Sequence, residues 1–145
     1  MPDKDIIIHT DGGSRGNPGQ AAVGYSIDFK GKVNDYAECV GTKTNNEAEY
    51  LALIIALKKA KQLAGKKAAK KCKVLCFSDS ELMVNQLNHK YKLKDAKIQK
   101  LFIEIWNLMI DFGEIEFAHI KREKNSRADK LLNDALDQEC SKLRL

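Results

Sequence analysis

Four acidic residues, Asp11, Glu49, Asp79 and Asp129, occupy positions where an α/β protein gathers ligands. Asp11 and Asp79 each follow an apolar run typical of a buried strand, and Glu49 and Asp129 each fall in the first turn of an expected helix. In open α/β sheets, ligands collect at the carboxyl ends of the strands. We therefore expect the four carboxylates to converge on that edge of one sheet.

Four like charges in one cleft would repel one another and raise each other's pKa, so a cation is needed to hold them. The candidate ligands are carboxylate oxygens alone, and no His or Cys pair accompanies them. This donor set favours the hard cations Mg²⁺ or Mn²⁺. Four carboxylates can bridge two ions about 4 Å apart, an arrangement that activates a water and stabilises the leaving oxygen in phosphodiester cleavage. The pattern thus indicates a metal-dependent nuclease with two ions per active site.

Each carboxylate also has a purely structural interpretation. Asp11 precedes Gly-Gly and is a suitable turn residue, and Asp79 stands where a helix N-cap is expected. Glu49 and Asp129 each lie three places after a residue that can cap a helix, which is the spacing of a capping box. These alternatives stay open for any one residue, whereas the convergence of all four favours the metal site.

The elements that must position these residues follow the order βββ-α-β-α-α-β-α. Strands are expected over residues 6–10, 21–29, 33–40, 74–77 and 114–120, and helices over residues 47–63, 81–88, 98–112 and from 126 onward. The Gly-rich stretch 12–19 is expected as a loop and the Lys-rich stretch 66–73 as a solvated linker. Three strands with short turns predict an antiparallel meander, and the β-α-β units predict two parallel strands with helices on both faces. We expect one α/β domain over residues 1–145 with a five-stranded mixed sheet.

The bulk properties agree with a cytoplasmic protein. The chain has 145 residues, 43% of them apolar, and a net charge of +5, which favours a polyanionic partner such as nucleic acid. Its longest apolar stretch, Leu51–Leu57, is too short to span a bilayer, and its first residues lack the layout of a signal peptide. The four cysteines are expected as reduced thiols, with a crosslink through Cys140 left open.

Several motifs resemble those of the type-I ribonuclease H family, in order and over nearly the whole chain: Thr10–Gly13 with Gly16–Gly19, Thr44–Glu49, Ser78–Ser80 and Asn125–Asp129. The resemblance implies a ribonuclease H-like fold and an endonuclease that hydrolyses the RNA strand of an RNA–DNA hybrid, leaving 3′-hydroxyl and 5′-phosphate ends. It implies a metal-ligand set of Asp11, Glu49, Asp79 and Asp129. In the family the glutamate lies three places after the second Asn, which selects Glu49 over Glu47.

The resemblance also implies contacts with the substrate. Groups along the minor groove, where amides contact ribose 2′-hydroxyls, would come from Gly12, Gly13, Ser14, Asn17, Asn45 and Asn46. Thr44 would help to hold a DNA phosphate. For Asn46, a helix-capping role is an equal alternative.

Two departures from the family pattern matter for function. The basic protrusion of many members is reduced here to His89–Asp95, so Lys90 and Lys92 are expected either to replace its phosphate contacts in part or to be solvated. The loop before the last Asp lacks the histidine that supports catalysis in many members. Arg122 is our candidate for its place, because it can contact phosphate although it cannot shuttle a proton; His119 is the alternative.

The leading hypothesis is therefore a monomeric ribonuclease H that binds RNA–DNA hybrid and no membrane. A related nuclease acting on double-stranded RNA or DNA is one alternative, since fold alone does not fix function. A catalytically silent nucleic-acid-binding module is another, although a pure binder has no use for four metal ligands.

Overall fold

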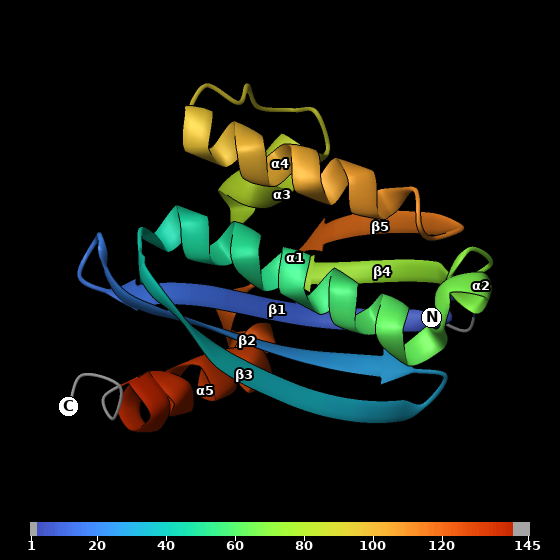
Figure 1. The fold of residues 1–145 in the computed structure, drawn as a ribbon, viewed down its shortest axis with the longest axis horizontal. Coiled ribbons are helices and arrows are strands. Elements are labelled where there is room, and N and C mark those ends of the chain that lie inside the picture. Colours follow the sequence, from blue (N-terminus) through green and yellow to red (C-terminus); the bar gives the residue numbers. More distant parts are fainter. Residues whose placement is uncertain (1–2, 141–145) are drawn as a thin grey trace.

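Five strands form one mixed sheet in the order β3-β2-β1-β4-β5 in the computed structural model, which describes residues 3–140 (Figure 1). The antiparallel meander consists of β1 (Ile6–Arg15), β2 (Gly19–Phe29) and β3 (Lys32–Lys43). The next two strands, β4 (Lys73–Ser78) and β5 (Glu114–His119), run parallel to β1. The expected fold class, with three antiparallel and two parallel strands, is confirmed.

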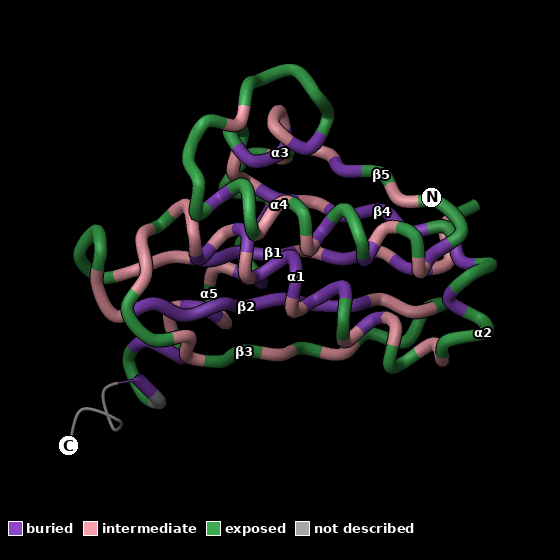
Figure 2. The backbone as a smooth tube through the Cα atoms, turned by 45° about the horizontal axis from the view of Figure 1, so that its top comes forward, coloured by how far each residue is buried: buried purple, intermediate pink, exposed green. Residues whose placement is uncertain are grey.

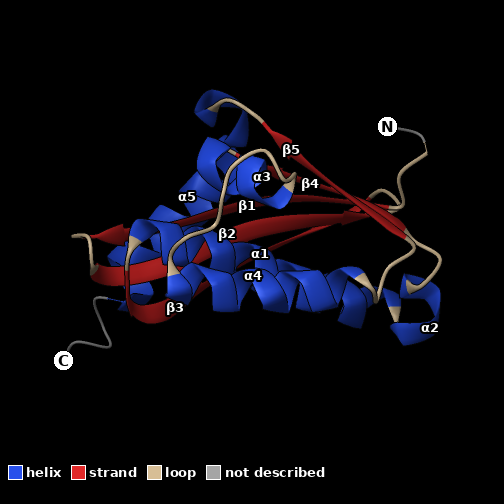
Figure 3. Ribbon diagram, turned by 90° about the horizontal axis from the view of Figure 1, so that it is seen from above, coloured by secondary structure: helices blue, strands red, loops and turns tan. Residues whose placement is uncertain are grey.

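Helices cover both faces of this sheet. α1 (Asn45–Ala64) packs on β1 and β2, and α4 (Ala96–Met109) packs on α1 (Figure 3). α5 (Ser126–Ala135) lies behind the sheet in Figure 1. The shorter elements are α2 (Lys66–Ala69), α3 (Glu81–Leu87), the 3₁₀ turn η1 (Arg122–Asn125) and the π-helical turn η2 (Leu136–Cys140). Within the described residues, no helix has the length and apolar character needed to cross a membrane.

The core lies between the sheet and α1, and most residues of β2 and β4 are buried (Figure 2). Side chains alternate across a strand, so Ile6, Ile8 and Thr10 of β1 are fully buried on one face, whereas Ile7 and His9 on the other are half-buried. This alternation of buried and half-buried residues ends at Asp11, which is buried like Thr10 before it. A buried acidic residue therefore follows directly on the buried positions of this strand.

Two glycines allow the helices to approach the sheet closely. A Cβ on Gly12 would stand 2.1 Å from the Ala48 carbonyl oxygen of α1, and one on Gly24 would stand 2.5 Å from the Ala128 carbonyl oxygen of α5. Ala48 precedes Glu49 and Ala128 precedes Asp129. The absent side chains thus let both carboxylate-bearing helices come into contact with the sheet.

The Gly-rich stretch 12–19 was expected as a loop, and this prediction is wrong for residues 12–15, which belong to β1, and for Gly19, which begins β2. β1 continues to Arg15 because β2 pairs with it over its whole length, ending at Arg15 opposite Gln20. Parallel pairing with β4, in contrast, ends at Thr10 opposite Ser78. Asp11 is therefore the first residue beyond the parallel part of the sheet. The expected linker 66–73 is also partly ordered, because it contains α2.

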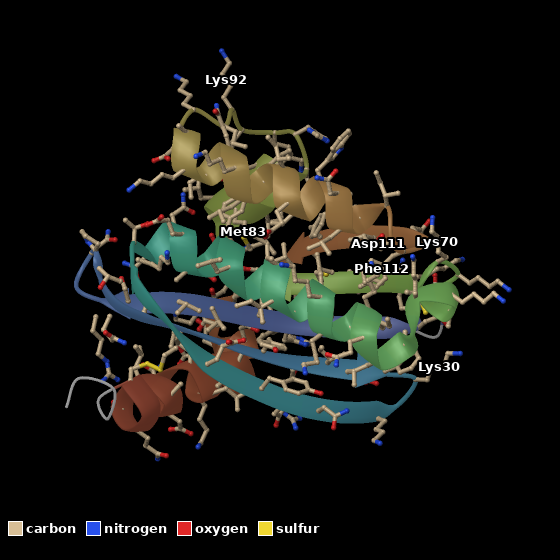
Figure 4. The ribbon with its side chains drawn as sticks, in the orientation of Figure 1. Lys30, Lys70, Met83, Lys92, Asp111 and Phe112 are labelled. Atoms are coloured by element: carbon tan, nitrogen blue, oxygen red, sulfur yellow. A yellow bond between two sulfur atoms is a disulfide. The ribbon has the colours of Figure 1, made fainter. Side chains whose placement is uncertain are left out.

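One disulfide joins Cys39 on β3 to Cys140 in η2, with the Cα atoms 5.7 Å apart (Figure 4, yellow bond). The expectation that all four cysteines are reduced is wrong for this pair and agrees with the structure for Cys72 and Cys76, which are free and buried. The partners are 101 residues apart in sequence, so spacing alone gave no sign of the pairing.

Replacing both bonded cysteines should destabilise the protein. A crosslink that closes a loop of this length restricts the unfolded chain, so Cys39→Ser/Cys140→Ser should lower the free energy of unfolding by about 2–5 kcal/mol. Urea unfolding followed by circular dichroism would measure this difference. Reductant should lower the stability of the wild type to that of the double variant and leave the double variant unchanged; a wild type insensitive to reductant would contradict the prediction.

Candidate active site

Three carboxylates from distant parts of the chain meet at the end of the parallel strands. Asp11 on β1, Glu49 on α1 and Asp79 directly after β4 each offer an oxygen, and these oxygens all lie within 4.8 Å of one another. Asp129 on α5 is close enough to Asp11 for a hydrogen bond between the two carboxyl groups, which raises the pKa of Asp11. The structure thus brings all four predicted acidic residues together.

A cleft of about 590 Å³ opens beside these residues. Its lining includes Asp11, Glu49 and Asp129, and also Arg122 and the backbone of Gly12, Gly13 and Ser14.

The capping alternatives do not account for the carboxylates. Thr44 caps α1, since its hydroxyl accepts from the Glu47 N–H at 3.1 Å and Glu47 Oε1 accepts from the Thr44 N–H at 3.0 Å. Glu47 and not Glu49 is therefore the capping-box residue, and Asn46 lies inside the helix. Ser80 caps α3 in place of Asp79. Glu49 and Asp79 are therefore free of the capping tasks that the sequence left open for them.

Burial and mutual repulsion raise the pKa of three of these groups. Burial, followed by the charges of Asp79 and Asp129, raises the pKa of Asp11 to about 8. Burial and the charge of Asp11 hold the pKa of Glu49 well above its ordinary value. Burial also raises the pKa of Asp79, with Arg122 acting in the opposite direction. In the protein alone, the charged form of this cluster is unfavourable.

The donor set fits a divalent hard cation. The cluster offers carboxylate oxygens alone, the ligands that Mg²⁺ and Mn²⁺ prefer. Asp79 Oδ2 is buried and has no hydrogen-bond partner among the residues described. A buried anionic oxygen without a donor is costly unless a cation or another ligand completes it.

Arg122 places a cation beside the cluster. Its Nε lies 3.8 Å from Asp79 Oδ2, and its side chain is 84% exposed whereas that of Asp79 is 5% exposed. An exposed arginine at this distance is weakly held, so it is free to turn toward a bound phosphate. His119 ends β5 nearby, and its charge also lowers the pKa of Asp79, as the smallest of the contributions.

The residues proposed to read the substrate form a small network at the mouth of the cleft. Asn45 Oδ1 accepts from the Ser14 N–H at 2.9 Å, and the Asn45 N–H donates to Asn17 Oδ1 at 3.0 Å. In the part of the chain that is described, the side-chain amide nitrogens of Asn17 and Asn45 have no protein acceptor and stay available as donors.

Lys90 and Lys92 do not line this cleft. They border a separate hollow of about 370 Å³ between α3 and α4, together with Tyr91 and Phe102. Lys92 projects away from the body of the molecule (Figure 4). The structure therefore leaves their contact with a substrate as a prediction.

Two asparagines bond to Asp129 or to the residue before Asp11, and neither was identified from the sequence as part of the site. Asn133 Nδ2 donates to the Asp129 carbonyl at 2.9 Å and to Asp129 Oδ1 at 3.2 Å. Asn125 Nδ2 donates to the Thr10 carbonyl at 2.8 Å. Both lie four positions from Asp129, and for Asn133 that helical spacing was a signal that could have been used.

The raised pKa of Asp11 predicts an unusual effect of its neutralisation. Because its pKa is raised from 3.8 to about 8 in the folded protein, the metal-free protein loses stability as pH rises between these values. Asp11→Asn removes this loss, so without metal it should unfold at a higher temperature than the wild type at pH 8.5, with a smaller difference at pH 5. Thermal unfolding with chelator at both pH values measures this, and parallel behaviour of the two proteins would count against it.

Comparison with known proteins places this site in a family. A family model described as reverse transcriptase-like matches residues 9–135. Ribonuclease HI of Halobacterium salinarum is 35% identical over 141 residues, covering 94% of this chain and 68% of the relative. A bifunctional protein of Mycobacterium tuberculosis is 36% identical over 135 residues, covering 91% of this chain and 35% of the relative. The chain thus spans about a third of the length of the first curated relatives, at 35%.

Solved structures give the same result. The crystal structure of LC11-RNase H1 in complex with an RNA/DNA hybrid is similar with a TM-score of 0.85 and 42% identity, covering 92% of this chain and 98% of that one. The ribonuclease H1 of Halobacterium salinarum is similar with a TM-score of 0.83 and 34% identity, covering 91% and 97%. Taken with the fold and the carboxylate cluster, these likenesses show that the chain belongs to the type-I ribonuclease H family, in a compact form without the basic protrusion.

Proposed function

We propose that this protein hydrolyses the RNA strand of RNA–DNA hybrids with divalent cations held by Asp11, Glu49, Asp79 and Asp129. The observation that carries the proposal is the approach of three carboxylate oxygens within 4.8 Å of one another, in a chain of this family. Without a cation, a cluster of buried carboxylates does not stabilise the fold, since burial and repulsion oppose their ionisation.

Two ions, Mg²⁺ or Mn²⁺, would supply an activated water and a positive charge for the leaving oxygen of the phosphodiester. The protein supplies fixed ligands and a defined approach for the substrate. Glu49 is oriented by the Gly12 N–H, which donates to its Oε1 at 2.9 Å, and Asp129 is oriented by Asn133. Such contacts fix the direction of each ligand oxygen before a cation arrives.

Recognition of the hybrid is proposed for Gly12, Gly13, Ser14 and the Asn17–Asn45 network. The free amide nitrogens of Asn17 and Asn45 are donors suited to ribose 2′-hydroxyls and base edges. Asn46 and Thr44 flank them at the start of α1. The net charge of +5 supports binding to a polyanion, and Lys90 and Lys92 are proposed to contact phosphates outside the cleft.

A monomeric protein located in the cytoplasm is part of the proposal. The free thiols of Cys72 and Cys76 suit a reducing compartment, whereas the Cys39–Cys140 disulfide is unusual in one. Size-exclusion chromatography of the purified protein and thiol titration of the protein as extracted would test these two points.

Asp11→Asn tests the proposed activity directly. It keeps the shape of the side chain and removes a negative ligand, so cleavage of a labelled RNA–DNA hybrid with Mg²⁺ should fall by more than about 100-fold. Binding of the hybrid in chelator should change far less. Duplex RNA and duplex DNA are tested in parallel, and with each substrate Mg²⁺ and Mn²⁺ are compared with chelator.

The substrate panel separates the alternatives. Cleavage of duplex RNA in preference to the hybrid would favour the related nuclease, and tight binding without cleavage under any metal condition would favour the silent binding module. Full activity of Asp11→Asn on the hybrid would overturn the proposal.

Arg122 should assist turnover through its charge. Losing a charge-assisted contact to the phosphate should lower kcat of Arg122→Ala about 10-fold, and Arg122→Lys should keep part of the activity because the charge stays. His119→Ala serves as the matched control and should change kcat little. A crippled His119→Ala beside an unaffected Arg122→Ala would show that the histidine has this role.

A further inference from the structure

Asn125 is a buried residue bonded to β1 next to Asp11. It is 1% exposed, and it is the last residue of η1, directly before α5. Its Nδ2 donates to the Thr10 carbonyl at 2.8 Å, across 115 residues of sequence. Thr10 precedes Asp11 and is the last residue of β1 that pairs with β4, so this bond fixes the backbone at the point where Asp11 begins the part of β1 that pairs with β2 alone.

The same side chain lies close to Asp79. Burial raises the pKa of the Asp79 carboxyl, and Arg122 and then the Asn125 amide act in the opposite direction. Asp129 follows Asn125 by four residues, on the helix that begins directly after it. A single amide therefore connects the segments that carry three of the four carboxylates.

A capping role does not explain this residue. Asn125 occupies the N-cap position of α5, where asparagine ordinarily accepts a bond from the backbone of the helix. Here its side chain makes no such bond and is turned toward β1 instead. The sequence places a good cap at this position, and the fold uses it for another purpose.

Asn125 and two residues near it each have a buried oxygen without a hydrogen-bond partner among residues 3–140. Within the described part of the chain, three buried side-chain atoms have no hydrogen-bond partner: Thr10 Oγ1, Asp79 Oδ2 and Asn125 Oδ1. Buried polar atoms nearly always have a hydrogen-bond partner, and these three atoms belong to Asn125 and to two residues near its side chain. Such atoms persist where water or a ligand completes them, which indicates that this spot is built for a bound group.

We propose that Asn125 is a positioning residue that sets the separation of Asp11, Asp79 and Asp129 for divalent cations. This inference rests on the proposed function, because it assumes that the carboxylates bind metal. Asn125 would be a neighbour of the metal ligands and not a ligand itself. Loss of such a neighbour typically lowers metal affinity or activity 10–100-fold.

Metal binding without substrate is the first test. Mn²⁺ should raise the unfolding temperature of the wild type, since a ligand that binds the folded state stabilises it. In Asn125→Ala, the Mn²⁺ concentration that gives half of this rise should increase by about 10–100-fold. In Asn125→Ser, which keeps one donor, the increase should be smaller.

Catalysis gives the second readout. In Asn125→Ala, kcat on the hybrid at fixed Mg²⁺ should fall by about 10–100-fold, while KM stays within about 3-fold because the substrate is held elsewhere. Raising the Mg²⁺ concentration should restore part of kcat. A residue with a structural role alone would lower stability without changing the metal dependence.

Asn88→Ala is the matched control. Asn88 Nδ2 also donates to a strand carbonyl, that of Phe117, at 3.1 Å, but its bond does not involve a residue next to a carboxylate of the cluster. This variant should lose stability without any shift in the Mn²⁺ or Mg²⁺ dependence.

The outcomes separate this inference from the proposed function. If Asp11→Asn abolishes cleavage but the metal dependence of Asn125→Ala equals that of the wild type, the inference alone is overturned. If Asp11→Asn keeps full activity, the proposed function fails first. If neither Asn125→Ala nor Asn125→Ser folds, Asn125 is required by the fold itself, and the positioning role is overturned.

Discussion

Repulsion among buried carboxylates is the constraint on which the rest of this structure depends. Asp11, Glu49 and Asp79 lie within a few ångströms of one another, and their raised pKa values record the cost of ionising them there. The elements that carry them must resist being pushed apart. β1 is held by strands on both sides, and α1 is held by its capping box and its contact with Gly12.

The helix that carries Asp129 is secured at its far end. In the second half of α5 and the start of η2, Leu132, Ala135 and Leu136 form a small apolar cluster with Ala22 of β2. The disulfide from β3 to η2 closes this cluster, and Arg15 forms an ion pair with Asp137 beside it. The orientation of Asp129 thus depends on packing about two turns away as well as on its own neighbours.

Sequence patterns predicted the fold class and the four acidic residues because both depend on local signals. Apolar alternation identifies strands, and an acid after a strand or in a first helical turn has few possible locations.

What the sequence did not reveal depends on contacts between distant segments. The continuation of β1 past Asp11 is decided by pairing with β2, the Cys39–Cys140 bond by the docking of η2 on β3, and the role of Asn125 by a bond to Thr10. The alternative that Asn46 caps α1 could not be decided from sequence, because Thr44 and Asn46 are both suitable caps and the backbone conformation selects Thr44.

The close approaches at Gly12 and Gly24 bear on how mutational data for such an enzyme are interpreted. Neither glycine offers a side chain to metal or substrate, yet any larger residue would move α1 or α5 outward and carry Glu49 or Asp129 with it. A saturation screen scored by turnover would rank both positions beside the ligands themselves. Substitutions at these glycines would fail because two backbones lie too close together for a side chain. Only a structure distinguishes such a steric requirement from a role in the chemistry.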